Sequence, residues 1–289
     1  MSADVIELGK FDRPGHLRLR GFYTAAGLTV RVQPAKLTDP ERDGIARCVA
    51  AARLIGAHRP DLMPRMLDHG TVARGRLGYL VEEAVAGTTP RGPRQVSAAM
   101  VRVATELFAI QQAIGIDSRR LSALAEPEFP ARWRSVVAHG HVRDALGAQV
   151  ERLIARDAML EVSFTHGDLV SSNVLDTPRG PVLIDWEYAG EQPIVFDLAK
   201  MHVNAGAAGA AAERLAGVWG PAIGQRPDHY SVLEQLALAH AVVLSRHEAR
   251  AMRAQQAGRN APLTRQTRRR AHALEELLSL AAGAREPKQ

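Results

Sequence analysis

The segment "SFTHGDLVSSNVL", residues 163–175, places three polar residues and a glycine between two apolar runs. These residues are His166, Gly167, Asp168 and Asn173. A second segment, "VLIDWEYAG" at residues 182–190, ends another apolar run with Asp185. The pattern predicts two short strands joined by the turn "PRG", with polar loops at their outer ends. We therefore expect the two carboxylates and the side-chain amide to lie close together.

Two carboxylates and an amide form a chemically specific set. Carboxylate and amide oxygens are the ligands that Mg²⁺ prefers, together with waters and substrate phosphates. Phosphoryl transfer needs such a metal to neutralise phosphate charge, and a carboxylate that orients the attacking hydroxyl. Asp168 fits the second role, whereas Asn173 and Asp185 fit the first.

The composition is that of an ordinary globular protein with room for a sizeable core. The chain has 289 residues, of which 46% are hydrophobic and 24% are charged, enough for one large or two small domains. No apolar stretch approaches the length of about 18 residues that predicts a membrane span, and the N-terminus does not resemble a signal peptide. The single cysteine, Cys48, excludes an internal disulfide and lies in an apolar run. We expect a buried thiol in a cytoplasmic protein without a membrane partner.

The net charge of +6 does not by itself indicate a nucleic-acid partner. The densest basic run, at residues 265–270, leads directly into a helical pattern that contains Glu275 and Glu276. Aromatic residues make up only 4% of the chain, and none alternates with this run. We interpret the run as a solvated helix start and expect no nucleic-acid binding.

The first ninety residues predict a small, β-rich lobe. Alternating segments at residues 16–23 and 28–33 flank the turn "TAAG" and indicate a hairpin. A helix is expected over residues 44–57, and two further strands at residues 65–70 and 77–83. The turn-rich segment after residue 87 marks the end of this lobe.

The remainder of the chain predicts a mostly helical lobe. A helix is expected to begin near Ser97, which could serve as its N-cap. The other helices are expected at residues 129–138, 143–160, 195–219, 228–256 and 264–282. The two parts together predict an α+β protein with an N-terminal lobe at residues 1–87 and a C-terminal lobe at residues 88–289.

The order and spacing of the polar residues resemble the aminoglycoside phosphotransferase and choline kinase family, whose members are relatives of the protein kinases. The matching residues are His166-Gly167-Asp168, Asn173, Ile184-Asp185-Trp186-Glu187 and, in "AGEQPIVFDLAK", Asp197. The resemblance implies a bilobal, protein-kinase-like fold and a small-molecule O-phosphotransferase. It also implies a nucleoside triphosphate, ATP or GTP, as the donor, Mg²⁺ as the cofactor and a small-molecule hydroxyl as the acceptor.

The resemblance also implies roles for the motif residues. Asp168 would be the catalytic carboxylate, and Asn173 and Asp185 would hold Mg²⁺. Supporting roles fall to four residues, which are His166, Gly167, Glu187 and Asp197. The histidine would brace the loop, the glycine would allow a close turn, and Asp197 would serve structure. Glu187 either lines the acceptor site or caps the loop.

In the small lobe, the resemblance implies a nucleotide site but the sequence departs from the family pattern. The backbone of Glu83, Ala84 and Val85 would contact the purine. Arg31 occupies the strand position where the family has a phosphate-gripping lysine, and Lys36 follows five residues later. Either basic residue could contact the phosphates; in the second alternative Arg31 points to solvent.

Two further family features are missing from this lobe. The helix over residues 44–57 contains no carboxylate to pair with the basic residue, so Glu41 and Asp43 are the nearby candidates. No glycine-rich phosphate loop is present, and "KFDRPGH", with Gly15, is its expected counterpart.

The charge balance bears on the acceptor. Residues 198–289 contain thirteen lysines and arginines and seven acidic residues, whereas a site for a polycationic aminoglycoside should be acidic. We therefore favour antibiotic inactivation with a nucleoside antibiotic of the capuramycin type, or another weakly charged antibiotic, as acceptor. The alternatives are an aminoglycoside or macrolide phosphotransferase, a metabolic small-molecule kinase, and a catalytically weak kinase-like binding protein.

Overall fold

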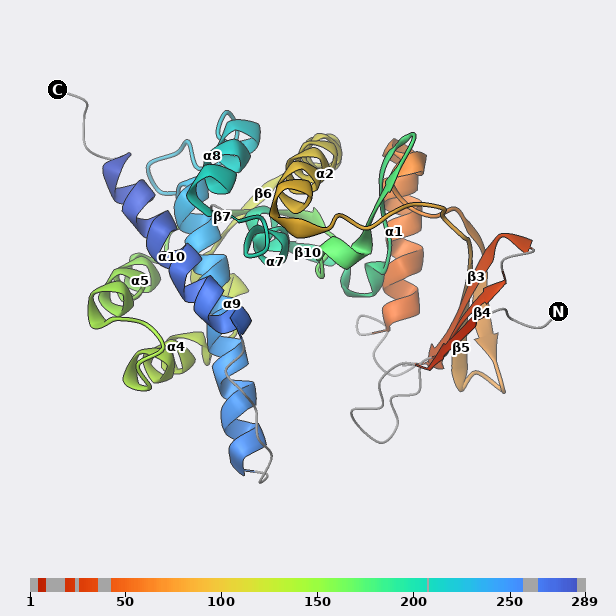
Figure 1. The fold of residues 1–289 in the computed structure, drawn as a ribbon, viewed down its shortest axis with the longest axis horizontal. Coiled ribbons are helices and arrows are strands. Elements are labelled where there is room, and N and C mark those ends of the chain that lie inside the picture. Colours follow the sequence, from red (N-terminus) through yellow and green to blue (C-terminus); the bar gives the residue numbers. More distant parts are fainter. Residues whose placement is uncertain are drawn as a thin grey trace. The chain divides into compact units, whose positions relative to one another are not determined.

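A computed structural model of the chain describes residues 5–8, 19–23, 26–35, 43–206, 208–256 and 265–284. It contains two compact units (Figure 1), each of which is described by itself. The first unit comprises Met1–Pro90 and His166–Gly190, and the second comprises Arg91–Thr165 and Glu191–Gln289. The motif segment at residues 166–190 thus joins the N-terminal residues in one unit. The predicted lobe boundary after residue 87 remains a prediction.

The first unit is built on a five-stranded antiparallel sheet with the order β1-β2-β3-β5-β4. The strands are β1 (Val5–Leu8), β2 (Leu19–Tyr23), β3 (Leu28–Pro34), β4 (Met66–Val72) and β5 (Leu77–Glu83). The predicted hairpin forms, because β2 pairs with β3 from Leu19↔Val32 to Tyr23↔Leu28; residues 16–18 of that prediction lie outside the described ranges. The two later strands are confirmed within two residues.

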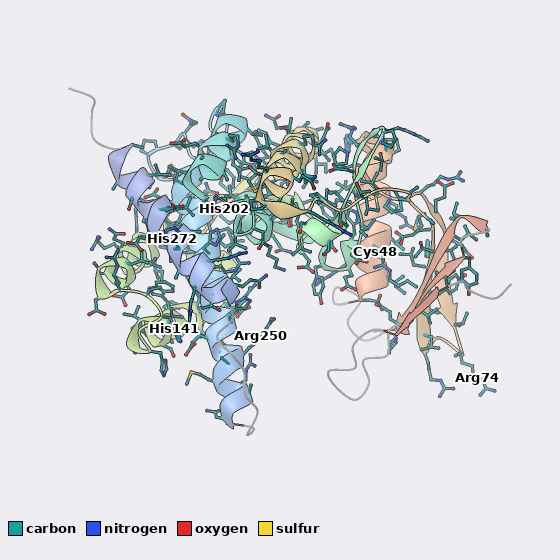
Figure 2. The ribbon with its side chains drawn as sticks, in the orientation of Figure 1. Cys48, Arg74, His141, His202, Arg250 and His272 are labelled. Atoms are coloured by element: carbon teal, nitrogen blue, oxygen red, sulfur yellow. The ribbon has the colours of Figure 1, made fainter. Side chains whose placement is uncertain are left out.

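One helix and a small hairpin complete the first unit. Helix α1 (Gly44–His58) is capped by Asp43, whose carboxylate accepts hydrogen bonds from the backbone amides of Ile45 and Ala46. The 3₁₀ turn η3 (Pro60–Leu62) follows the helix. Strands β8 (Val174–Thr177) and β9 (Gly180–Leu183) form the predicted second hairpin. Cys48 on α1 (Figure 2) is buried, as expected.

The face of the large sheet that lies towards α1 is unusually polar. Along β3, Arg31 and Gln33 are buried, whereas Val30 and Val32 are only partly buried. On β5 the buried residues alternate in the same way and end with Glu82. Because successive side chains of a strand point to opposite faces, this register places charged side chains inside the unit.

The second unit is mostly helical around a three-stranded sheet with the order β10-β7-β6. Its helices are α2 (Gly92–Ile114), α3 (Leu121–Leu124), α4 (Phe129–Ala138), α5 (Asp144–Arg156), α6 (Ile194–Asp197), α7 (Ala199–His202), α8 (Ala208–Trp219), α9 (Val232–Gln256) and α10 (Arg265–Gly283). Its strands are β6 (Asp117–Arg120), β7 (Met159–Thr165) and β10 (Gly190–Pro193). Helices α9 and α10, in blue in Figure 1, pack against each other. The α+β fold class is confirmed.

Three expectations for the helical unit were wrong. Helix α2 begins at Gly92, with a proline in its first turn, so Ser97 lies buried inside the helix instead of capping it. The helix expected at residues 143–160 ends at Arg156, because Asp157 adopts the left-handed conformation with φ 42°; strand β7 follows. The helix expected at residues 195–219 is divided into α6, α7 and α8.

Buried basic side chains link α7, α9 and α10. The Nη1 of Arg270 donates to the carbonyl of Ala199 at 3.1 Å and lies 3.4 Å from Nδ1 of His240. The Nε2 of His240 lies 2.9 Å from Nδ1 of His202, whose Nε2 lies 2.9 Å from the carbonyl of Ala208. A single tautomer satisfies this chain, with both imidazoles neutral and protonated on Nε2. Burial lowers the pKa of Arg270 to about 10.

A further histidine extends this basic group along α9. His247 follows His240 by seven residues and so lies on the same helix face. Burial, with contributions from Arg270, Arg250 and Lys200, lowers the pKa of His247 to about 4. Arg250, labelled in Figure 2, is exposed on the same helix. The group therefore carries several positive charges and neutral histidines that resist protonation.

None of the helices within the described ranges is both long enough and apolar enough to cross a membrane.

The low pKa of His247 predicts loss of stability in mild acid. The unfolded chain binds this proton near pH 6.5, and the folded chain binds it only near pH 4. His247 therefore costs no stability above pH 6.5, and it lowers the free energy of unfolding progressively as the pH drops towards 4. We expect the free energy of unfolding, measured with urea, to decrease between pH 7 and pH 5. His247→Gln should reduce that decrease, whereas the same substitution at the exposed His272 should retain it. An equal decrease in the wild type and His247→Gln would contradict the assignment.

Candidate functional site

The loop that follows β7 is held by a fully buried histidine. His166 accepts a hydrogen bond from the backbone amide of Asp168 through Nδ1 (3.3 Å) and donates through Nε2 to the carbonyl of Ile184 (2.8 Å). Its ring packs against Trp186, with ring centroids 4.6 Å apart. Gly167, between these residues, has φ 78°, a conformation that favours glycine. The loop is thus hydrogen-bonded to the open end of the β8–β9 hairpin, at the residue that follows β9.

Asn173 connects the same loop to the hairpin from the other side. Its Nδ2 donates to the carbonyl of Asp168 at 2.9 Å, and its own carbonyl accepts from the amide of Ile184 at 3.0 Å. The β8–β9 ladder continues this pairing with Val174↔Leu183. Because the amide nitrogen is engaged inward, the amide oxygen of Asn173 is the atom suited to a cation.

Asp185 lies two residues after the end of β9. It directly follows Ile184, whose amide donates to the backbone carbonyl of Asn173. Its backbone is in the left-handed region, at φ 67° and ψ 50°, which aspartate tolerates better than most residues. Its carboxylate Oδ1 lies 3.2 Å from Nη2 of Arg31, and the side chain is 24% exposed. One loop and one hairpin thus connect Asp168, Asn173 and Ile184-Asp185 through the hydrogen bonds of Asn173. The roles of the three motif residues remain predictions.

Arg31 lies inside the first unit, not in solvent. It is 6% exposed, and its Nη2 lies 3.2 Å from Oε2 of Glu82 as well as 3.2 Å from Asp185. Burial opposes the charged form, but the surrounding acidic groups outweigh burial and raise the pKa of Arg31. The alternative in which Arg31 points to solvent is therefore wrong. Lys36 and Gly15 lie outside the described residues.

Glu82 is the residue that the sequence analysis missed. The candidates were Glu41, which lies outside the described residues, and Asp43, which caps α1. The sequence contained one indication of this pair, since the alternating pattern of two strands can place an arginine and a glutamate on the same sheet face. To identify the pair, the register of the two strands must also be known. In that register Glu82 lies opposite Thr29 and is therefore diagonal to Arg31.

The segment expected to contact a purine begins at the last residue of β5 and lines a pocket of about 570 Å³. The pocket lining includes Glu83, Ala84, Val85, Pro64 and Val182. The carboxylate of Glu83 accepts from Nε of Arg65 at 2.9 Å, and the amide of Ala84 donates to the carbonyl of Gly27 at 2.8 Å. The backbone at the end of β5 is thus held in place.

The two remaining predicted residues, Glu187 and Asp197, lie in a short turn and at the end of a short helix. Glu187 lies in the 3₁₀ turn η5 (Trp186–Tyr188), so close to the start of α1 that a Cβ on Gly44 would approach its Cβ to 3.1 Å. Asp197 is buried at the end of α6, in the second unit.

The donor set suits a hard cation that needs few protein ligands. No group of three or more His, Cys, Asp and Glu side chains that could hold a metal occurs within the described ranges. The amide oxygen of Asn173 and the carboxylate of Asp185 offer oxygen ligands only, and Mg²⁺ typically takes one or two protein ligands with phosphates and waters. The single positive charge of Arg31 faces the two carboxylates of Glu82 and Asp185. These three side chains therefore have an excess of negative charge. The residues therefore fit Mg²⁺.

Solved structures share this fold at low sequence identity. Choline kinase LicA from Streptococcus pneumoniae superposes with a TM-score of 0.55 at 15% identity, covering 96% of this chain and 95% of that one. An aminoglycoside phosphotransferase from Alicyclobacillus acidocaldarius has the same score and identity, with coverage of 99% and 92%. Spectinomycin phosphotransferase APH(9)-Ia gives 0.53 at 9% identity, with coverage of 98% and 93%. These matches confirm the protein-kinase-like fold.

The sequence comparisons complete this assignment. A search of curated proteins finds no match. The family model described as "Phosphotransferase enzyme family" matches residues 24–236, which include β3, α1 and the whole motif loop. Because that match spans well over half of the 289 residues, the chain belongs to the phosphotransferase enzyme family.

Proposed function

We propose that this protein transfers the γ-phosphate of a nucleoside triphosphate to a hydroxyl group of a small molecule. The observation that carries the proposal is the bonded arrangement of the motif loop. The amide of Asn173 holds the backbone of Asp168 at 2.9 Å, and the backbone of Ile184 holds Asn173 at 3.0 Å. A carboxylate for the acceptor and oxygen ligands for a cation thus share one rigid support.

The roles follow from the chemistry of each group. The carboxylate of Asp168 accepts the hydrogen bond of the acceptor hydroxyl and orients its oxygen for in-line attack. Asn173 and Asp185 would hold Mg²⁺, which would neutralise charge on the phosphates. Arg31 contributes a guanidinium, which binds phosphate well. His166 keeps the loop in place by its bonds on both ring nitrogens.

The donor is an adenine or guanine nucleotide, and the comparisons support ATP. One solved relative of similar fold, the aminoglycoside phosphotransferase APH(4)-Ia, was determined with AMP-PNP and hygromycin B, and spectinomycin phosphotransferase was determined with ADP and spectinomycin. In this chain the backbone of Glu83, Ala84 and Val85 contacts the purine. GTP is the alternative donor.

The acceptor is weakly charged, and a nucleoside antibiotic of the capuramycin type is the favoured class, with antibiotic inactivation as the role. The supporting observation is the charge balance of residues 198–289, which contain thirteen lysines and arginines and seven acidic residues. An excess of positive charge disfavours the binding of a polycation. Aminoglycosides and macrolides are the alternative antibiotics, followed by the substrates of a metabolic kinase. A catalytically weak binding protein is the remaining reading.

The first experiment measures phosphate transfer from ATP and, in parallel, from GTP in the presence of Mg²⁺. The acceptors are aminoglycosides, macrolides, nucleoside antibiotics and simple amino alcohols. We expect transfer to one weakly charged class and none to the polycations. Preferred transfer to an aminoglycoside would refute the acceptor proposal and leave the reaction intact. Nucleotide binding without transfer to any acceptor would favour the binding-protein reading.

Asp168→Ala is expected to abolish transfer because it removes the carboxylate that orients the hydroxyl. We expect kcat to fall by about 10²–10⁴-fold, with nucleotide affinity nearly unchanged. Asp168→Asn, which keeps the shape, should be similarly impaired. Steady-state kinetics and nucleotide titration check this expectation, and near-normal turnover in both variants would overturn the assignment.

Asp185→Asn is expected to weaken nucleotide binding only when Mg²⁺ is present, since it removes a charged oxygen ligand and keeps the size of the side chain. Titration of ATP with and without Mg²⁺ measures the difference. Asp117→Asn, at an exposed carboxylate on β6, is the control and should bind as the wild type does. Equal Mg²⁺ dependence in Asp185→Asn and the wild type would contradict the metal role.

A further inference from the structure

The lysine-to-glutamate ion pair expected between a strand and helix α1 is absent from the sequence, and the geometry supplies a different one. We propose that Glu82, on strand β5, is the positioning residue that holds Arg31 for the phosphates of the nucleotide. The inference rests on the proposed function, because it assigns a role within the same site. It also identifies the carboxylate partner that α1 does not provide.

The register of the sheet makes this pair possible. Arg31 lies opposite Leu80, and Glu82 lies opposite Thr29, so the two charged side chains are diagonal neighbours on one face of adjacent antiparallel strands. Their exposed side-chain fractions are 7% and 8%, and Nη2 lies 3.2 Å from Oε2. A buried charge needs such a partner, since an isolated one is strongly unfavourable.

Helix α1 cannot take this role, because it presents a thiol where a carboxylate would be needed. Sγ of Cys48 is the α1 atom near Arg31, at 3.8 Å from Nη1. Burial raises the pKa of Cys48 to about 12, so the thiol is neutral at physiological pH. Residues 44–58 contain no aspartate or glutamate. The carboxylate partner of Arg31 must therefore come from outside α1.

Arg31 keeps donors to spare beyond this pair. Its Nη2 is shared between Glu82 and Asp185, both at 3.2 Å. Its Nε has no hydrogen-bond partner among the described residues, and its Nη1 has only the distant thiol. Asp185 is assigned to the cation in the proposed function, so Glu82 is the carboxylate that would stay paired with Arg31 when the cation is bound. The guanidinium is therefore anchored at one nitrogen. Its buried Nε and its Nη1 keep hydrogen-bonding capacity that the described residues do not fill.

The experiment compares a nucleotide that has phosphates with a nucleoside that has none. ADP and adenosine are titrated in the absence of Mg²⁺ against the wild type and Glu82→Gln, which removes the charge and keeps the shape. We expect ADP affinity to fall by at least about tenfold, while adenosine affinity stays unchanged. Asp68→Asn, at an exposed carboxylate of the same sheet, is the matched control and should bind both molecules as the wild type does.

A rescue variant separates positioning from general destabilisation. Cys48→Asp places a carboxylate on α1 beside Arg31, and in the Glu82→Gln background it should restore ADP affinity. Cys48→Ala in the same background should not. KM for ATP should rise in Glu82→Gln more than kcat falls, whereas a merely structural defect would lower the amount of folded protein without this pattern.

The outcomes distinguish the two proposals. ADP affinity in Glu82→Gln equal to that of the wild type overturns the role of Glu82 and leaves the proposed function standing. A wild type that binds neither ADP nor adenosine overturns the proposed function, and the role of Glu82 falls with it. Should Glu82→Gln fail to fold, as judged by circular dichroism, Glu82→Asp replaces it. That variant keeps the charge but shortens the side chain, and unchanged ADP affinity in it would again overturn the positioning role.

Discussion

The hydrogen bond from Nε2 of His166 to the carbonyl of Ile184 is the interaction on which the candidate site depends. It joins the loop after β7 to the end of β9, at 2.8 Å and away from water. With the second bond at Nδ1 it sets the tautomer of the ring, since one nitrogen must donate while the other accepts. Asn173 repeats the connection from the other side through its side chain and its backbone. The motif loop is thus held in place by hydrogen bonds within the protein, without a bound ligand.

A second constraint is the charge buried between β3, β5 and the end of β9. Arg31 is the positive group at the centre, and the carboxylates of Glu82 and Asp185 face it at equal distances. Such a group is costly to bury unless its members remain paired, which explains why this sheet has a polar face where an apolar one is usual. The excess of negative charge suits a site that would receive a divalent cation.

The helical unit has the opposite electrostatic character. Arg270, which is 3% exposed, contacts a backbone carbonyl and a neutral histidine, and its pKa is lowered by burial alone. The surrounding positive groups lower the pKa of His247 further. The two clusters, around Arg31 and around Arg270, thus differ in the sign of the charge that they bury. Because a shared fold does not define a substrate, the acceptor has to be argued from such features of the individual chain.

The sequence alone determined the motif residues, the β8–β9 hairpin, the main strands of the first sheet and the α+β class, because each of these depends on local periodicity and turn chemistry. It overextended the helix after residue 143, where a left-handed Asp157 ends α5, and it joined α6, α7 and α8 into one helix. Only the tertiary structure decided that Arg31 points inward and that Glu82 is its partner. A partner across a sheet depends on strand register, which brings together residues 51 positions apart and leaves no local trace in the order of the amino acids.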